Sequence, residues 1–260
     1  MNLNTIYTGD CIELMPSLVE PNSVDMIFAD PPYNLSGKKL DLVNNTTGGA
    51  YHKVNAKWDV FTATDYLEFT QQWMSLCHTA LKDGGSLYIS CTQHNIGEIL
   101  TTGKSLGLKL NNVITWYKTN AMPNITKRTF THSTEFVCWF VNGHNWTFNY
   151  SAVKQLNPHK TKDGQNKQMR DFLDFIELPV VQGKERIKGE DNRAAHPTQK
   201  PVRLLQIIIA ASTNEGDIVL DPFFGTGTTG FVAKSMGRNW IGIEKDPHYA
   251  QIAHQRIFAQ

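Results

Sequence analysis

The sequence of 260 residues has no long apolar run and few cysteines. No apolar stretch approaches the roughly 20 residues that cross a bilayer. The start MNLNTIYTGD has neither the basic region nor the apolar region of a secretory signal. We therefore expect a cytoplasmic protein without a membrane span. The cysteines lie far apart, with no C-x-x-C pair and no histidines at zinc-finger spacing, so we expect no metal site: Cys11, Cys77, Cys91 and Cys138.

The sequence also has little net charge, only +1, but this charge is unevenly distributed. Residues 118–203 contain 14 Lys and Arg against 8 Asp and Glu, whereas the rest contains 11 against 16. A basic region set into an acidic scaffold is typical of a protein that contacts nucleic acid. A solvated charged surface would give the same pattern. Charge alone therefore leaves both interpretations open.

The last third of the chain shows the clearest secondary-structure pattern. The apolar run at 218–220 ends in Asp221-Pro222 and a glycine-bearing turn, after which a helix is expected up to Gly237. A second strand, residues 240–243, ends at Glu244 before a final helix. These segments form two strand-helix units, which need further parallel strands to build a sheet covered on both faces.

The beginning of the chain provides those strands. The expected elements are a strand at 5–7, a helix from Cys11, a strand at 24–29, a helix at about 65–81, a turn at Gly84-Gly85, a strand at 86–90 and a hairpin from 113 to 140. We predict an α/β fold with a mostly parallel, doubly wound sheet and helices on both faces. Its order looks circularly permuted, so that the two halves of a nucleotide site come from opposite ends of the chain.

The glycine turn DPFFGTGTTG carries the first candidate site. Glycines at a strand-to-helix turn allow a ligand to approach the backbone closely. Gly225, Gly227 and Gly230 fit G-x-G-x-x-G, so this pattern alone does not exclude a dehydrogenase. Glu244 ends the next strand, where an acidic residue accepts hydrogen bonds from ribose hydroxyls.

The segment Asp30-Pro31-Pro32-Tyr33 distinguishes a dehydrogenase from another enzyme that binds a nucleotide. It directly follows an apolar strand, at the edge where ligands of doubly wound sheets bind. The prolines fix the backbone and remove two N-H donors, which leaves carbonyl oxygens as acceptors, and Tyr33 offers a flat face for stacking. Such acceptors suit an amino group, for which a dehydrogenase has no need.

Three motifs, FADPPYN, DPFFGTGTTG and HPTQKP, resemble in this order the beta-class amino-methyltransferases of DNA. The resemblance runs from Asn4 to the C-terminus and is closest to the MboIIA-like adenine methyltransferases of restriction-modification systems. It implies a circularly permuted Rossmann-like methyltransferase fold, S-adenosylmethionine as cofactor and adenine N6 in double-stranded DNA as substrate. A homodimer and functional pairing with a restriction endonuclease would also agree with it.

The same resemblance implies roles for individual residues. Asp30, Pro31, Pro32 and Tyr33 would form the catalytic segment. The cofactor's methionine end would lie near Asp221 and Phe223, its ribose at Glu244 and its adenine beside Asp10 and Lys245. His196, Thr198, Gln199 and Lys200 would cover the methionine portion. The remaining expected cofactor contacts are Cys11, Asp30, Gly225, Gly227 and Thr228.

Residues 151–195 are interpreted as an inserted target-recognition region, and the loop 36–59 is also expected to face DNA. Residues 1–150 and 196–260 would together form the catalytic domain. The basic side chains expected to hold phosphates or to reach base edges are Lys160, Lys162, Lys167, Arg170, Lys184, Arg186, Lys188 and Arg193.

The alternatives are N4-cytosine methylation, methylation of a protein or RNA amine, and a DNA-binding module that has lost its cofactor. The resembling cytosine enzymes more often carry Ser at the position of Asp30, and the protein and RNA enzymes usually carry Asn there without an HPTQKP segment. Asp30 therefore favours adenine, and the intact Asp221 and Glu244 give no support to a cofactor-free module.

Overall fold

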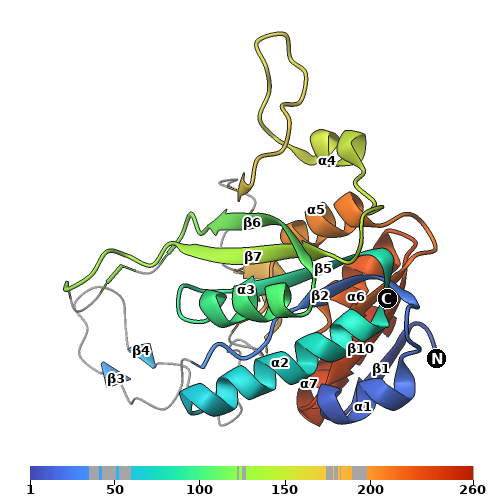
Figure 1. Cartoon of the computed structure of the whole chain (residues 1–260). Coiled ribbons are helices and arrows are strands. Elements are labelled where there is room, and N and C mark those ends of the chain that lie inside the picture. The colour runs from blue at the N-terminus through green and yellow to red at the C-terminus, as the bar shows by residue number, and fades with distance from the viewer. Residues whose placement is uncertain are drawn as a thin grey trace.

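An eight-stranded sheet forms the centre of the computed structural model (Figure 1). The structure describes residues 1–34, 41–42, 51–52, 60–121, 123–124, 127–173, 178, 181, 183–188 and 198–259. In spatial order the strands are β1 (Thr5–Thr8), β10 (Asn239–Glu244), β9 (Ile218–Asp221), β2 (Val24–Ala29), β5 (Leu81–Cys91), β7 (Thr134–Val141), β6 (Lys109–Tyr117) and β8 (Phe172–Leu173). Five of the seven neighbouring pairs are parallel, so the predicted mostly parallel sheet is confirmed.

Two strands from the C-terminal end of the chain lie between two strands from its N-terminal end. β1 pairs with β10, placing Ile6 beside Gly242, and β9 lies between β10 and β2. The N-terminal and C-terminal segments therefore build one continuous ladder, as the permuted order predicts.

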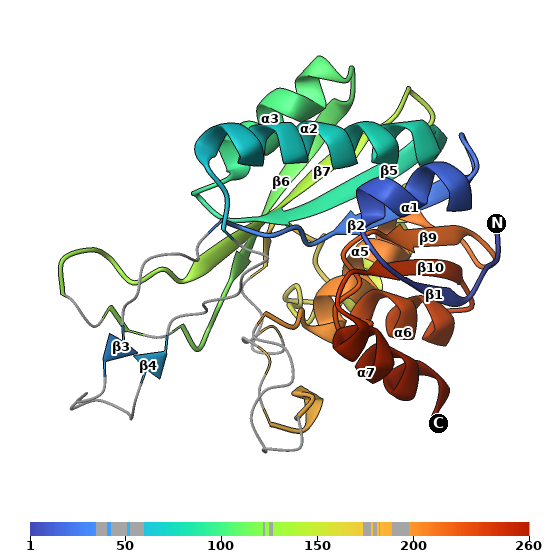
Figure 2. The same cartoon turned by 90° about the horizontal axis from the view of Figure 1, so that it is seen from below.

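Helices cover both faces of the sheet (Figure 2). On one face lie α1 (Cys11–Leu18), α2 (Ala63–Ala80) and α3 (Ile96–Ser105). On the other lie α5 (Val202–Ser212), α6 (Thr228–Ser235) and α7 (Pro247–Phe258), with α4 (Tyr150–Leu156) packed on α5. β2 lies between the two layers: Met26 and Phe28 enter one core cluster, and Ile27 and Ala29 the other. A strand buried on both faces needs a nearly continuous apolar sequence, which explains the run Met26–Ala29.

Local capping residues fix the ends of the helices near the strand edges. The carboxylate of Asp10 accepts a hydrogen bond from the Ile12 amide at 2.9 Å and begins α1. Asp246 begins α7 in the same way, with Pro247 in its first turn. After α6 the backbone of Gly237 adopts a φ of 72°, a left-handed conformation that glycine tolerates without strain.

The turn predicted at Gly84-Gly85 is wrong, because β5 runs through both glycines. The pairing of β5 with β2 shifts from Val24–Leu81 to Met26–Ser86, so an irregularity interrupts the ladder there. Gly84 has a φ of 80°, and a side chain there would collide with the backbone of Asn145. These glycines therefore serve a close backbone approach within a strand.

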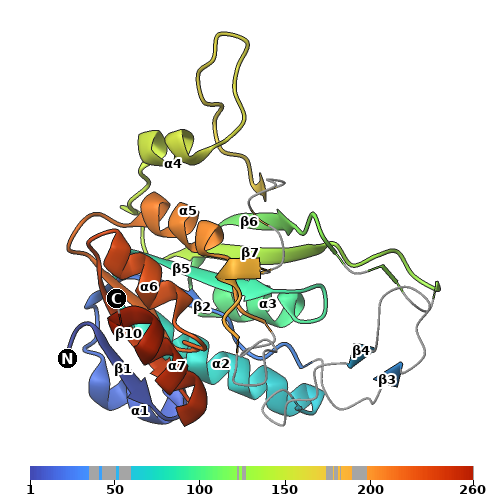
Figure 3. The ribbon, with the colours of Figure 1, turned by 180° about the vertical axis from the view of Figure 1, so that it is seen from behind.

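The expected insertion is joined to the main sheet. Phe172–Leu173 pairs with β6 as strand β8, and Leu173, Leu178 and Val181 are buried. The connection between α4 and β8 projects away from the sheet (Figure 3), and a short 3-10 helix, η2, spans Gly183–Glu185. In the loop 36–59 the structure describes only β3 (Asp41–Leu42) and β4 (Tyr51–His52), which pair antiparallel. Across the described ranges no helix is long and apolar enough to cross a membrane.

Candidate active site

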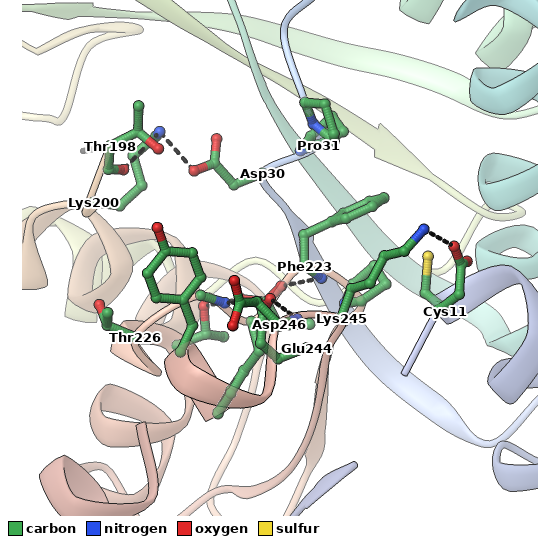
Figure 4. A pocket seen from close by; sticks show the side chains of 18 of the residues that line it. Cys11, Asp30, Pro31, Thr198, Lys200, Phe223, Thr226, Glu244, Lys245 and Asp246 are labelled. Atoms are coloured by element: carbon green, nitrogen blue, oxygen red, sulfur yellow. Dashed lines mark hydrogen bonds and ion pairs between the residues drawn. The ribbon is translucent and has the colours of Figure 1, made fainter. Parts of the chain in front are cut away.

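A cavity of about 780 Å³ lies where several parallel strands end. Asp30 directly follows β2, Asp221 ends β9 and Glu244 ends β10, and all three residues line this cavity. Figure 4 shows Asp30 and Glu244 in it. The same cavity is lined by these further predicted site residues: Asp10, Cys11, Pro31, Pro32, Tyr33, Thr198, Gln199, Lys200, Phe223, Gly225, Thr228 and Lys245. Residues from both ends of the sequence and from the segment at 198–200 are thus brought together.

The Asp30 carboxylate is held by two donors from the protein. The Tyr33 hydroxyl donates to Oδ1 at 2.7 Å, and the Lys200 ammonium group donates to Oδ2 at 2.7 Å. Lys200 is only 6% exposed. Burial acts to lower the pKa of Lys200, but the carboxylates of Asp30 and Glu135 outweigh it and raise this pKa above its ordinary value. Lys200 is therefore a cation at neutral pH.

Tyr33 lies largely buried beside Asp30, with 8% of its surface exposed. Its hydroxyl is also 2.7 Å from Ser90 Oγ, and Lys200 Nζ lies 5.2 Å from the centre of its ring. Burial, with a further contribution from Asp30, raises the pKa of the Tyr33 phenol, so the hydroxyl remains a donor. The Pro32 carbonyl is occupied as well, because the Tyr66 hydroxyl donates to it at 2.8 Å.

Asp221 is a buried carboxylate beneath the cavity. It accepts hydrogen bonds from the Phe223 amide at 2.9 Å and from the Thr229 hydroxyl at 2.5 Å. Burial raises its pKa to about 7, although both donors act to lower it. At neutral pH this group therefore exists in both protonation states.

Glu244 connects the glycine turn to the following loop. Its two carboxylate oxygens accept hydrogen bonds from the amides of Gly225 at 2.6 Å and Asp246 at 2.8 Å. Burial raises the pKa of this carboxyl group. Each oxygen keeps lone pairs that can accept from a ligand hydroxyl.

At another part of the cavity, Lys245 forms an ion pair with Asp10 at 2.8 Å. The hydrogen bond that Lys245 donates to the Asp10 carboxylate raises the pKa of Lys245. Cys11 is buried, and this burial, together with the charge of Asp10, raises the pKa of its thiol to about 12. The Cys11 thiol is therefore protonated at neutral pH and is not a nucleophile.

Comparison with known proteins identifies the family to which this site belongs. The model of the DNA methylase family, N6_N4_Mtase, matches residues 24–255. The chain belongs to this DNA methylase family. It is 41% identical to the Type II methyltransferase M.HinfI of Haemophilus influenzae, an alignment that covers 98% of this chain and 68% of that protein. It is also 41% identical to M2.DpnII of Streptococcus pneumoniae, over 94% of this chain and 86% of that protein.

Solved structures agree with this membership of the DNA methylase family. The crystal structure of the M1.HpyAVI-SAM complex is 28% identical with a TM-score of 0.68, and the alignment covers 98% of each chain. PvuII DNA methyltransferase, whose structure is described as cytosine-N4-specific, shares the fold with a TM-score of 0.72 at 19% identity, over 98% of this chain and 86% of that chain. The resemblance inferred from the three motifs is confirmed at the level of this family.

One predicted cofactor residue of the methylase, Gly227, is not among the described residues that line the cavity. Gly227 has a φ of 77°, and a Cβ atom there would lie 2.9 Å from Ala253 Cβ. Its role in the structure is thus to let α7 pack against the turn. His196 lies outside the described residues.

Several residues lining the methylase cavity were missed by the sequence analysis. Phe69 is one of them, and its ring lies 6.0 Å from that of the predicted Phe223, which also packs edge-on against Trp73 at 5.3 Å. Phe61 and Tyr249 complete this aromatic lining. Aromatic residues on an amphipathic helix look like ordinary core positions, so the sequence contained no separate signal for this wall.

The predicted basic side chains of the methylase are mostly exposed where they are described: Lys160, Lys162, Lys167, Arg170, Arg186 and Lys188. Arg193 and the side chain of Lys184 lie outside the described part of the structure. Gln199 has a second role besides lining the cavity. Its side chain accepts a hydrogen bond from the Ile187 amide at 3.1 Å and donates to the Glu185 carbonyl at 2.9 Å, which fixes the chain after η2.

Proposed function

We propose that this protein transfers a methyl group from S-adenosylmethionine to N6 of adenine in double-stranded DNA, in a restriction-modification system. The observation that carries the proposal is the position of Asp30-Pro31-Pro32-Tyr33 at one cavity with Asp221 and Glu244. Membership of the DNA methylase family limits the reaction to methylation of DNA. Asp at the first position of the segment favours adenine over cytosine.

The cavity fits the cofactor in size and in chemistry. A volume of about 780 Å³ lies within the range of roughly 300 to 1,000 Å³ that small-molecule and cofactor sites span. Glu244 has acceptor capacity for ribose hydroxyls, and Asp10 with Lys245 would flank the adenine. Phe223 and Asp221 would hold the methionine end with Thr198, Gln199 and Lys200. S-adenosylmethionine supplies an electrophilic methyl group on a sulfonium centre.

Asp30 and the Pro31 carbonyl would activate the target amine by accepting its two hydrogens. The nitrogen lone pair of adenine N6 is delocalised into the ring, and two acceptors would hold this nitrogen nearer tetrahedral geometry. Positioning and electrostatic stabilisation would then supply much of the rate enhancement. No covalent enzyme intermediate is needed, which agrees with the protonated state of the Cys11 thiol.

The DNA would be bound outside this cavity, with the target base turned out of the duplex into it. Residues 1–150 and 196–260 would form the catalytic domain. Residues 151–195 would recognise the target together with the loop 36–59, and their exposed lysines and arginines would neutralise phosphates. A homodimer and functional pairing with a restriction endonuclease stay predictions.

Incubation with unmethylated genomic DNA and isotopically labelled S-adenosylmethionine tests the proposal. The DNA is digested to nucleosides, and the label is located by chromatography. Label in N6-methyladenosine is the expected result. Label in N4-methylcytosine would keep the mechanism but change the base, because the same acceptors serve any exocyclic amine. DNA without label would overturn the proposal.

A further inference from the structure

Both oxygens of the Asp30 carboxylate are already occupied by groups of the protein. Tyr33 donates to one oxygen and Lys200 to the other, each at 2.7 Å. An amine that is to be activated by Asp30 needs one of these oxygens as its acceptor. Each oxygen keeps a lone pair for the amine, but the bound Lys200 cation makes the carboxylate a weaker acceptor, so we expect Lys200 to leave Asp30 when the amine binds.

Each donor has a second acceptor within reach. The Tyr33 hydroxyl already lies 2.7 Å from Ser90 Oγ. The Lys200 ammonium group lies 3.8 Å from Oε2 of Glu135, a residue near the start of β7. A movement of about 1 Å would bring Lys200 into a hydrogen bond of ordinary length with Glu135.

Oε2 of Glu135 is a buried acceptor that has no hydrogen-bond partner among the described residues. Its other oxygen forms an ion pair with Lys118 at 3.1 Å. A buried carboxylate oxygen without a donor costs free energy, since it has given up water without a replacement. This oxygen lies 3.8 Å from Lys200 Nζ, so it can accept a hydrogen bond from that ammonium group after a small movement.

We propose that Glu135 is a positioning residue for methyl transfer, which takes over the Lys200 ammonium group when the target amine engages Asp30. The inference rests on the proposed function. Lys200 remains a cation throughout, held by one carboxylate before the amine binds and by the other afterwards. Asp30 without Lys200 is a stronger hydrogen-bond acceptor, because a nearby cation no longer draws its electron density. Ser90 would retain Tyr33 in the same way.

A purely structural role for Glu135 makes a different prediction. Its ion pair with Lys118 joins Tyr117-Lys118 at the end of β6 to β7, so a structural residue would stabilise the fold and leave the rate of transfer alone. A positioning role affects the rate of transfer while cofactor binding and base flipping stay unchanged. Measuring stability, the rate of transfer, cofactor binding and base flipping in the same variants therefore separates the two roles.

The test compares Glu135→Gln with Glu135→Asp, and with Glu68→Gln as a control on the exposed surface of α2. The measurements are the single-turnover rate of transfer from labelled S-adenosylmethionine to DNA, the Kd for S-adenosylmethionine, the Tm and the fluorescence of 2-aminopurine at the target position. We expect Glu135→Gln to slow transfer by about 10- to 100-fold, the usual effect of losing a residue that orients another one in a site. Its Kd and fluorescence should match the wild type, and Glu135→Asp should recover part of the rate.

An unchanged rate in Glu135→Gln would overturn the inference while the wild type still labels DNA. Loss of rate together with loss of Tm and of cofactor binding, without recovery in Glu135→Asp, would assign Glu135 a structural role and also overturn it. A wild type that labels no DNA would show that the proposed function itself is wrong. A crystal structure with methylatable DNA and sinefungin gives a direct check: Lys200 should lie closer to Glu135 than to Asp30, and a flipped base beside an intact Lys200–Asp30 pair would refute the inference.

Discussion

The ammonium group of Lys245 lies 2.8 Å from Oδ2 of Asp10, although 235 residues separate them in the sequence. This pair joins the loop after β10 to the loop after β1, which are neighbours because β1 and β10 pair in parallel. Both residues line the cavity. The site is therefore assembled from the two ends of the chain, and substitutions in each part of the chain can test its properties separately.

Replacing Asp30 by Asn should abolish methyl transfer but preserve cofactor binding. The variant loses the charge of the acceptor that faces the amine, and we expect the single-turnover rate to fall by at least about 10²-fold. Asp65→Asn, at an exposed position of α2, is the control. Wild-type turnover in Asp30→Asn would show that the active site has been assigned wrongly.

Tyr33→Ala and Tyr33→Phe separate the ring from the hydroxyl. Loss of the ring should weaken capture of the flipped base by about 1 to 3 kcal/mol, the usual contribution of base stacking, whereas Phe keeps the ring. Titrations of DNA with 2-aminopurine at the target position measure this difference. If both variants captured the base equally poorly, the hydroxyl rather than the ring would be responsible.

The high pKa of Asp221 should make stability depend on pH. An unfolded Asp has a pKa of about 3.9, whereas burial raises that of Asp221 to about 7 in the folded protein. Between these values the folded state binds more protons than the unfolded state, so the free energy of unfolding falls as pH rises through this window. The loss is on the order of 4 kcal/mol and is complete above the folded pKa.

Asp221→Asn tests this dependence because the amide does not titrate. Urea denaturation of both proteins at pH 5 and pH 8 measures the free energy of unfolding. This free energy should decrease less between the two pH values in the variant than in the wild type. The Asn side-chain oxygen can still accept the hydrogen bond from the Phe223 amide. An equal decrease in both proteins would locate the titrating group elsewhere.

Gly242→Ala should destabilise the protein by about 1 to 3 kcal/mol through overpacking. A Cβ atom at Gly242 would lie 2.5 Å from the ring of Phe224, which stacks on Trp240 at 5.4 Å and cannot withdraw freely. Gly97, in α3, is the matched control, since an added Cβ there meets nothing within 4 Å. Gly97→Ala should stabilise the helix by up to about 1 kcal/mol, and urea denaturation measures both effects.

DNA affinity should fall steeply with added salt if the exposed lysines bind phosphates. Each phosphate contact contributes about 0.9 to the slope of log K against log salt concentration. Lys162→Ala, in the connection between α4 and β8, should therefore reduce this slope by about 1. Lys104→Ala, at the exposed end of α3, should leave it unchanged. A wild-type affinity that does not respond to salt would argue against this surface.

The strand ends that carry Asp30, Asp221 and Glu244 could be predicted because each follows a short apolar run in the sequence. Their convergence followed from the parallel order of the strands. Local patterns failed at Gly84-Gly85, since paired glycines between apolar segments have the same pattern whether they form a turn or a strand irregularity.

The surroundings of Asp30 could not be predicted in the same way. Glu135 looks like an ordinary acidic residue in an alternating strand, and Ser90 looks like the end of another. Their contacts depend on the registers of β5, β6 and β7 and on how β2 is placed against them. These contacts are set by tertiary packing, which leaves no local pattern in a single sequence.

The cavity lies above the junction between two blocks of the sheet. β9 and β2 meet through only two paired residues, Met26 with Val219 and Ile27 with Leu220, whereas β2 meets β5 through five. Asp30 belongs to one block, and Asp221 and Glu244 belong to the other. A molecule held by all three would link the two blocks across one of the two shortest strand pairings of the sheet, so that part of its binding energy would stabilise the folded state.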